Sequence, residues 1–307
     1  MERNPGDVFC SEAARAERAP LAGTATRADA WLLVEHYGAW GARAVEQNDL
    51  PAAVQEWMQA QAAALKPVVG KVRPLLVRRD EGRSRTTFAC FLAIAREDRR
   101  ELYRLDVQGH LDLAGLDLAA LLAGGELEDA RQDHGLLLVC GNGRRDRCCA
   151  RLGVATWRAL AVEVGEEAWL STHQGGHRYA AAGLSLPEGI AYGYLTTAEI
   201  EPLLAARGRG EIHLPCFRGR TFHDAPVQAA DAMLRAGRHE AALDPWRLAE
   251  AVEATPGEWR VTFAAPTARH AVRLRRESEE ALVSCSPAKR KTIDRFTLID
   301  IDSENTA

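Results

Sequence analysis

The sequence has no apolar run of the ~18 residues that a membrane-spanning helix needs. Residues 1–20, MERNPGDVFCSEAARAERAP, lack the apolar core of a signal peptide. Positive charge is not in excess either: the formal net charge is −4 at pH 7, whereas a general nucleic-acid-binding protein would be clearly basic. These absences predict a cytoplasmic protein that acts on neither membranes nor nucleic acids.

Cysteine is sparse and scattered. The seven cysteines form no C-x-x-C pair, which excludes a thioredoxin-type redox motif. A secreted domain stabilised by disulfides would be shorter and denser in cysteine, and in a reducing cytoplasm clustered cysteines are ligands or reactive thiols. Four cysteines stand alone in the sequence, and we expect them to be buried structural residues. They are Cys10, Cys90, Cys216 and Cys285.

The hydrophobic pattern predicts an α/β fold. The chain has 307 residues, of which 47% are hydrophobic and 27% charged, and this allows two globular domains with a smaller appendage. After an irregular lead-in, the first half has a buried strand at 31–35 and a helix at 50–65 capped by Asp49. Three strands (RPLLVRR, TTFACFLAIA and ELYRLDV) and a short helix at 115–123 follow.

The second half repeats this order of elements. A strand at 136–140 precedes a helix at 149–164, and the segments AWLST and IAYGYLT are expected to be strands. LVE at 33–35 and LVC at 138–140 occupy matching places, 105 residues apart. We therefore predict a duplicated α/β unit in which only the second copy carries metal ligands.

The pattern changes after residue 210 to a small α+β tail. We expect one helix capped by Asp224, a second helix after Asp244-Pro245, and strands at 258–264, 269–276 and 294–301. The closing SPAKRKT and DSENTA segments are polar and are expected to be partly mobile. The predicted divisions are the lead-in 1–28, an α/β unit without ligands at 29–130, the ligand-bearing unit at 131–210, and the tail at 211–307.

Two short segments carry the clearest chemical signal, CGNGRRDRCC at 140–149 and STHQGGHRYA at 171–180. Thiolates and neutral imidazoles are the donors that tetrahedral zinc or the irons of a [2Fe–2S] cluster prefer. A helix N-terminus and nearby guanidinium groups favour the ligating thiolate form. The candidate ligands are Cys140, Cys149, His173 and His177, and the arginines are Arg144, Arg145 and Arg147.

Spacing leaves the nature of the centre open. The C-x8-C spacing is too long for a zinc knuckle but wide enough to wrap a cluster. Gly175 and Gly176, between the two histidines, indicate a loop folded tightly around a bulky centre. Adjacent Cys148 and Cys149 point in different directions, so one of them is the ligand, and spacing favours Cys149 only slightly. The alternatives are a zinc protein with the same ligands and a thiol-based redox module.

Three further residues have suggestive spacing in the segment that begins the tail. His213, Cys216 and His223 could be ligands, but no matching donor group lies near them in sequence. We therefore interpret them as structural residues.

The segments CGNGRRDRCCARLG, STHQGGHRYA, PEGIAYGYL and the early FCS…APLAGTA together resemble the sucrase/ferredoxin-like family, from about Phe9 to Phe222. The resemblance implies a thioredoxin-like ferredoxin fold and a [2Fe–2S] cluster, with Cys140 and Cys149 on one iron and His173 and His177 on the other. It favours Cys149 over Cys148, which becomes a possible substitute ligand. It implies an electron-transfer or redox-sensing protein with a redox partner protein rather than a hydrolase. The tail would dock that partner or cover the cluster.

Overall fold

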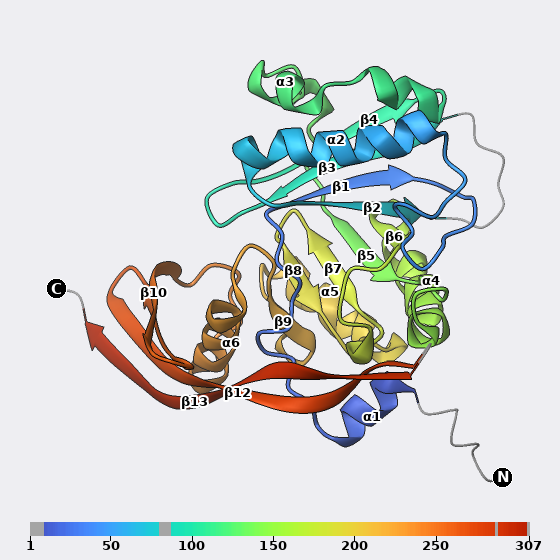
Figure 1. Cartoon of the computed structure of the whole chain (residues 1–307). Coiled ribbons are helices and arrows are strands. Elements are labelled where there is room, and N and C mark those ends of the chain that lie inside the picture. The colour runs from blue at the N-terminus through green and yellow to red at the C-terminus, as the bar shows by residue number, and fades with distance from the viewer. Residues whose placement is uncertain (1–8, 80–86, 286–287, 306–307) are drawn as a thin grey trace, which may run out of the picture.

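Two β-sheets organise the chain in the computed structural model, which describes residues 9–79, 87–285 and 288–305 (Figure 1). The large sheet has nine strands in the order β4-β3-β1-β2-β6-β5-β7-β8-β9, and the smaller antiparallel sheet has the order β10-β11-β12-β13. Helices pack on both sheets, so the predicted α/β class is confirmed. In the described part of the chain, no helix is both long and apolar enough to cross a membrane.

The first half of the large sheet is a β-α-β unit followed by a hairpin. Strands β1 and β2 are parallel, β3 is antiparallel beside β1, and β4 is antiparallel beside β3. Every residue of β1 is buried, as expected for a Leu- and Val-rich strand in the middle of a sheet. The elements are β1 (Ala30–Glu35), α2 (Ala52–Val69), β2 (Val72–Arg78), β3 (Phe88–Ala95), β4 (Arg100–Val107) and α3 (Leu118–Ala123).

The second half repeats this topology. Strands β5 and β6 are parallel, β7 is antiparallel beside β5, and β8 is antiparallel beside β7. The two halves join where β2 and β6 pair antiparallel, so the predicted duplication is present as one continuous sheet. The elements are β5 (Leu136–Cys140), α4 (Val154–Val164), β6 (Ala168–Ser171), β7 (Gly183–Leu186), β8 (Ile190–Tyr192) and α5 (Ile200–Gly208).

The large sheet gains a ninth strand from beyond the predicted end of the second unit. Strand β9 (Phe217–Arg220) pairs antiparallel with β8, so the sheet of the ligand-bearing unit extends past residue 210. The predicted boundary at that position therefore cuts through one continuous sheet.

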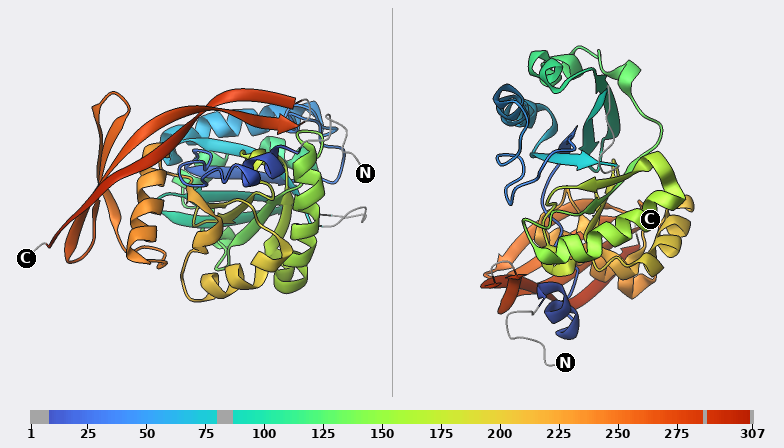
Figure 2. Two further views of the ribbon diagram at one scale, coloured as in Figure 1. Left: turned by 90° about the horizontal axis from the view of Figure 1, so that it is seen from below. Right: turned by 90° about the vertical axis from the view of Figure 1, so that its right-hand side faces the viewer.

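The tail is a helix against the second sheet, and its last hairpin is unusually long. The apolar face of α6 packs on the sheet through residues such as Leu234, Phe263 and Phe296. The hairpin of β12 and β13 runs along one side of the molecule as far as α1 (Cys10–Ala16), as Figures 1 and 2 show. The elements are α6 (Ala225–Arg238), β10 (Arg247–Thr255), β11 (Glu258–Ala264), β12 (Ala268–Cys285) and β13 (Ala288–Asn305).

Four local predictions are wrong. The lead-in contains α1. Asp49 does not cap α2, which begins after Pro51, because its carboxylate binds His36 Nε2 at 2.7 Å. The helix expected after Asp244-Pro245 is strand β10, since pairing with β11 outweighs the helical preference of its alanines and glutamates. Residues 288–292 and 302–305 of the closing segments belong to β13.

Candidate metal centre

The two predicted cysteine ligands meet where a strand end faces a helix start. Cys140 is the last residue of β5, and Cys149 opens the turn Cys149–Gly153 that leads into α4. This turn lies directly on the end of the strand, because a Cβ at Gly153 would lie 1.9 Å from the Cys140 carbonyl oxygen. Both thiols are fully buried, with 1% and 0% of the residues exposed.

The histidines reach the same edge of the sheet because β5 and β6 are parallel neighbours. Cys140 pairs with Ser171 in the register, so the chain leaving β6 carries His173 to the end of β5. The next turn requires left-handed backbone at two positions, with φ of +99° at Gly175 and +75° at Gly176. This is the tight loop that the glycine pair predicted, and it brings His177 back against His173.

Donor atoms of four predicted ligands converge. One ligand atom each from Cys140, Cys149 and His173 lie within 4.8 Å of one another, and His177 Nδ1 is 3.4 Å from His173 Nε2. Two ring nitrogens, His173 Nδ1 and His177 Nε2, are buried without a hydrogen-bond partner. Buried polar atoms are nearly always paired, so the site has donor capacity that the chain itself does not use.

The electrostatics favour one thiolate in this group. A hydrogen bond from the Cys149 thiol, with a further contribution from His173, lowers the pKa of Cys140 well below its ordinary value. The same hydrogen bond and burial raise the pKa of Cys149. The pair therefore shares one proton, which a metal ion would displace on binding.

The predicted arginines surround the site rather than contact the thiols. Arg145 and His173 line a cavity of about 350 Å³. Arg144 and Arg147 line a second cavity, of about 750 Å³, on the side of Trp40. The arginines thus give the rim of the site a positive charge, and the thiolate is stabilised from within the donor group.

Cys148 belongs to a different group, as its opposite direction from Cys149 predicted. Its Sγ lies 3.5 Å from Cys10 Sγ and 3.5 Å from Cys285 Sγ. This position argues against Cys148 as a substitute for Cys149. It also corrects the interpretation of Cys10 and Cys285, which are buried as expected but do not stand alone.

One positioning residue, Arg218 on β9, carried no signal in the sequence beyond the basic segment FRGR. Its Nη1 donates to the Gly175 carbonyl at 3.2 Å and its Nε donates to Thr24 Oγ1 at 3.0 Å. A Cβ at Gly176 would lie 2.2 Å from its guanidinium group. Burial lowers the pKa of Arg218 to about 10. The buried guanidinium thus supports the histidine loop from below.

We expect Arg218→Met to lower the free energy of unfolding by about 2 kcal/mol, because buried carbonyls at Gly175 and Thr24 lose their donor. Urea denaturation would measure this, and metal content would report whether the histidine loop keeps its order. The matched control is Arg209→Met, at an exposed arginine with 60% of its side chain accessible. Equal stabilities of the two variants would contradict the role assigned to Arg218.

The three other suggestive residues lie elsewhere. His213 Nε2 is 2.7 Å from Glu199 Oε2, and Cys216 lies beside this pair, so the histidine already has a partner. His223 is separate, with its Nε2 3.6 Å from Glu97 Oε1. The structural interpretation fits both positions.

Acid should destabilise the protein through His223. Burial lowers its pKa from 6.5 to about 4, so the unfolded chain binds this proton more readily than the folded one. The contribution is fully present above pH 6.5 and is lost as the pH falls towards 4. We expect a loss of about 2 kcal/mol across this window, which His223→Gln removes. Denaturation at several pH values, with the exposed His134→Gln as control, checks it, and parallel curves for all three proteins would contradict it.

The fold and the donor group define an α/β protein with a buried cysteine and histidine centre. A family model described as sucrase/ferredoxin-like matches residues 21–219. The chain therefore belongs to the sucrase/ferredoxin-like family. Searches of curated proteins and of solved structures find no match. The matched span contains all four predicted ligands but neither Cys10 nor Cys285.

Proposed function

We propose that this protein binds a [2Fe–2S] cluster through Cys140, Cys149, His173 and His177 and acts in one-electron transfer or redox sensing. The observation that carries the proposal is the convergence of four donors of suitable type, with two ring nitrogens left unpartnered. Membership of a family named for ferredoxins supports it.

The donor set tunes the charge of the site. A bound [2Fe–2S] cluster would supply a centre that gains and loses one electron. Two thiolates and two neutral imidazoles carry two fewer negative charges than four thiolates, so this donor set favours a higher potential. Burial keeps His177 neutral by lowering its pKa, to which the neighbouring His173 adds.

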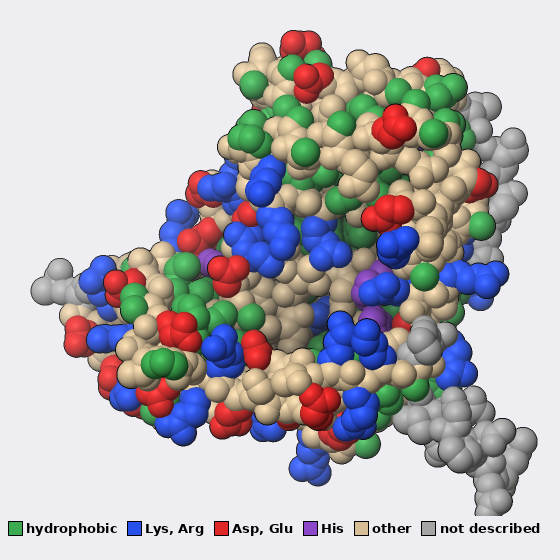
Figure 3. Space-filling model, viewed as in Figure 1, with side chains coloured by type: hydrophobic (Ala, Val, Ile, Leu, Met, Phe, Trp, Pro, Cys, Tyr) green, Lys and Arg blue, Asp and Glu red, His purple; other side chains and the backbone are tan. Residues whose placement is uncertain are grey.

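A route for electrons leads to the surface beside His173. This residue lines the cavity of about 350 Å³ together with Arg43, Arg73 and Arg145. Figure 3 shows histidine side chains in a hollowed face of the molecule with Lys and Arg side chains around them. A positive rim steers partners of opposite charge, so the expected partner is a redox protein with an acidic docking surface. The reducing cytoplasm is the compartment proposed for both.

The test is the visible absorption spectrum of anaerobically purified protein, before and after dithionite, with iron and sulfide measured per chain. Brown absorbance that bleaches on reduction is the expected result. A colourless protein from iron-supplied cells would overturn the proposal.

Zinc is the second candidate for the same ligands. Three donor atoms within 4.8 Å of one another is a span that one ion can bridge, because zinc–sulfur bonds are ~2.3 Å long. A colourless protein with zinc bound at this site would favour it. A thiol-based redox module is less compatible with the structure, because both cysteines are buried away from any substrate.

A further inference from the structure

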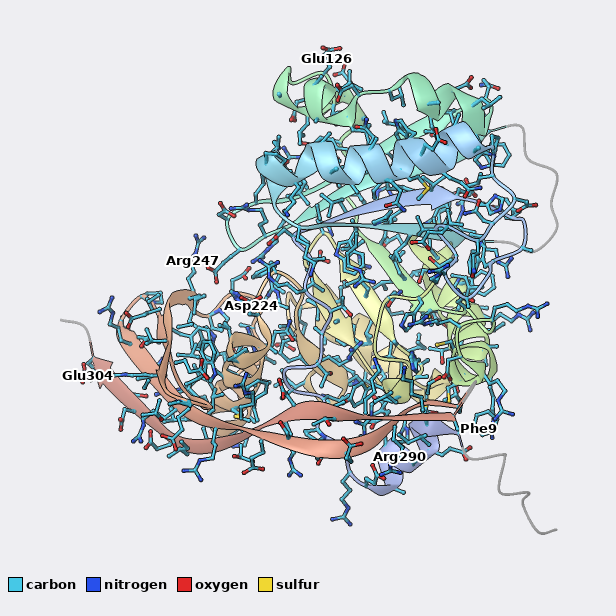
Figure 4. The ribbon with its side chains drawn as sticks, in the orientation of Figure 1. Phe9, Glu126, Asp224, Arg247, Arg290 and Glu304 are labelled. Carbon is cyan, nitrogen blue, oxygen red and sulfur yellow. The ribbon has the colours of Figure 1, made fainter. Side chains whose placement is uncertain are left out.

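A second group of potential ligands lies beside the first and comes from three distant segments. Cys10 opens α1, Asp146 and Cys148 lie in the loop between β5 and α4, and Cys285 ends β12. Figure 4 shows Phe9, the residue before Cys10, at the end of the long hairpin. All four side chains are buried. The exposed fractions are 0% for Cys10, Asp146 and Cys148 and 5% for Cys285.

We propose that Cys10, Asp146, Cys148 and Cys285 form a second metal site, which binds one zinc ion through three thiolates and a carboxylate oxygen. The four ligand atoms lie within 4.8 Å of one another. This site goes beyond the proposed cluster and does not depend on it. On binding, the zinc ion replaces the three thiol protons, which are released to solvent.

The distances fit one tetrahedral ion. Bonds of ~2.3 Å to sulfur and ~2.0 Å to oxygen place tetrahedral sulfur atoms about 3.8 Å apart and sulfur and oxygen about 3.5 Å apart. Cys148 Sγ is 3.5 Å from Sγ of both Cys10 and Cys285. Asp146 Oδ1 is 3.0 Å from Cys285 Sγ and 3.7 Å from Cys10 Sγ. Adjustments of a few tenths of an ångström would complete the coordination.

The carboxylate is held in place as a ligand would be. Asp146 Oδ2 accepts hydrogen bonds from Ser284 Oγ and from the Cys285 amide, both at 3.0 Å, and Oδ1 accepts one from the Cys148 amide at 3.0 Å. These bonds aim Oδ1 at the three thiols. Such outer hydrogen bonds orient carboxylates at metal sites.

A cation is needed to balance the buried charge. Within the described part of the chain, the ion-pair partner of Asp146 is His177, whose Nε2 lies at 3.8 Å from Oδ2. A carboxylate buried among thiols without close positive charge is costly, and a divalent ion would offset that cost. The donor chemistry, three soft thiolates and one carboxylate, is that of a zinc site.

The site would fasten both ends of the chain over the first centre. Strand β12 packs against α1 and against the turn His177–Tyr179, so the hairpin end covers the histidine loop. Cys10 and Cys285 lie outside the span that the family model matches. The inferred zinc ion therefore holds this chain's terminal segments onto the loop that also provides Cys149.

The experiment measures zinc and iron per chain in the full-length protein and in matched alanine variants. Cys10→Ala and Cys285→Ala should lose one zinc ion and weaken zinc binding in a chelator competition by at least about tenfold, while the other centre keeps its metal. Cys140→Ala should do the reverse, which separates this proposal from the cluster. Cys90→Ala, at a buried cysteine of β3 outside both groups, should change neither metal.

A measurement on the unaltered chain guards against variants that fail to fold. Cobalt(II) added to metal-free protein should give the visible bands of a tetrahedral thiolate site, and Cys285→His should retain a tetrahedral spectrum with fewer sulfur-to-metal transitions. Zinc retained by Cys10→Ala and Cys285→Ala would overturn the proposal. So would a disulfide between two of the three cysteines in freshly purified protein, shown by mass after alkylation.

Discussion

Cys140→Ala is expected to abolish iron and sulfide binding at the first centre. Cys140 is the donor with the strongest thiolate character, and its Sγ lies within 4.8 Å of both Cys149 Sγ and a His173 ring nitrogen. Without it only one thiol remains at the cysteine end of the site, and losing a direct ligand costs more than the ~10–100-fold effect of an outer partner. Iron and sulfide analysis with the visible spectrum would measure the loss.

The matched control is Cys90→Ala, because Cys90 is equally buried on β3 but lies in neither donor group. It removes the same atoms from the core at a similar cost in stability and should keep full absorbance. His173→Ala and His213→Ala form a second matched pair, of which only the first should lose the chromophore. Retention of iron by Cys140→Ala would sink the assignment of the cluster ligands.

The cysteine and histidine ligands could be predicted because neighbouring strands bring their ends together. Cys140 ends a strand that the apolar run LLLVC marks clearly, and the segment after β6 begins at the same edge of the sheet. The duplicated order was visible for the same reason: buried parallel strands are continuous apolar runs. Local pattern and topology were therefore sufficient for the fold class and for the convergence of the donors. The thioredoxin-like assignment and the identity of the metal stay predictions.

The second donor group could not be predicted because it depends on contacts between distant segments. Cys10 and Cys285 each meet Cys148 across well over a hundred residues of sequence, with separations of 138 and 137. Cys285 reaches the group only through the register of a long hairpin, which the sequence indicated as two short runs. Arg218 was missed for a related reason, since its burial depends on β9 joining the large sheet. In each position tertiary pairing, not local preference, decides the role of the side chain.

Gly153→Ala is expected to lower the free energy of unfolding by at least ~3 kcal/mol, at the upper end of the range for overpacking. The backbone at Gly153 is ordinary helical, with φ −67° and ψ −40°, so the effect comes from crowding rather than from conformational preference. The added methyl group would lie 1.9 Å from the Cys140 carbonyl oxygen, a backbone atom that cannot rotate away. The end of β5 and the turn that carries Cys149 must therefore move apart, and we expect the first centre to lose metal as well. Urea denaturation and metal analysis would measure the two effects.

Gly208→Ala is the matched control, because Gly208 ends helix α5 and a Cβ there would meet nothing within 4 Å. Its replacement removes backbone freedom from the unfolded chain without crowding the folded one, and should leave stability unchanged or raise it by about 0.5 kcal/mol. If Gly153→Ala were as stable as Gly208→Ala, the turn would have room to adjust, and close packing of helix on strand could not be what sets the separation of Cys140 and Cys149. If it were unstable but still bound a full complement of metal, the ligands would be held by the metal itself. The pair of variants thus separates a centre preorganised by the fold from one organised by its metal.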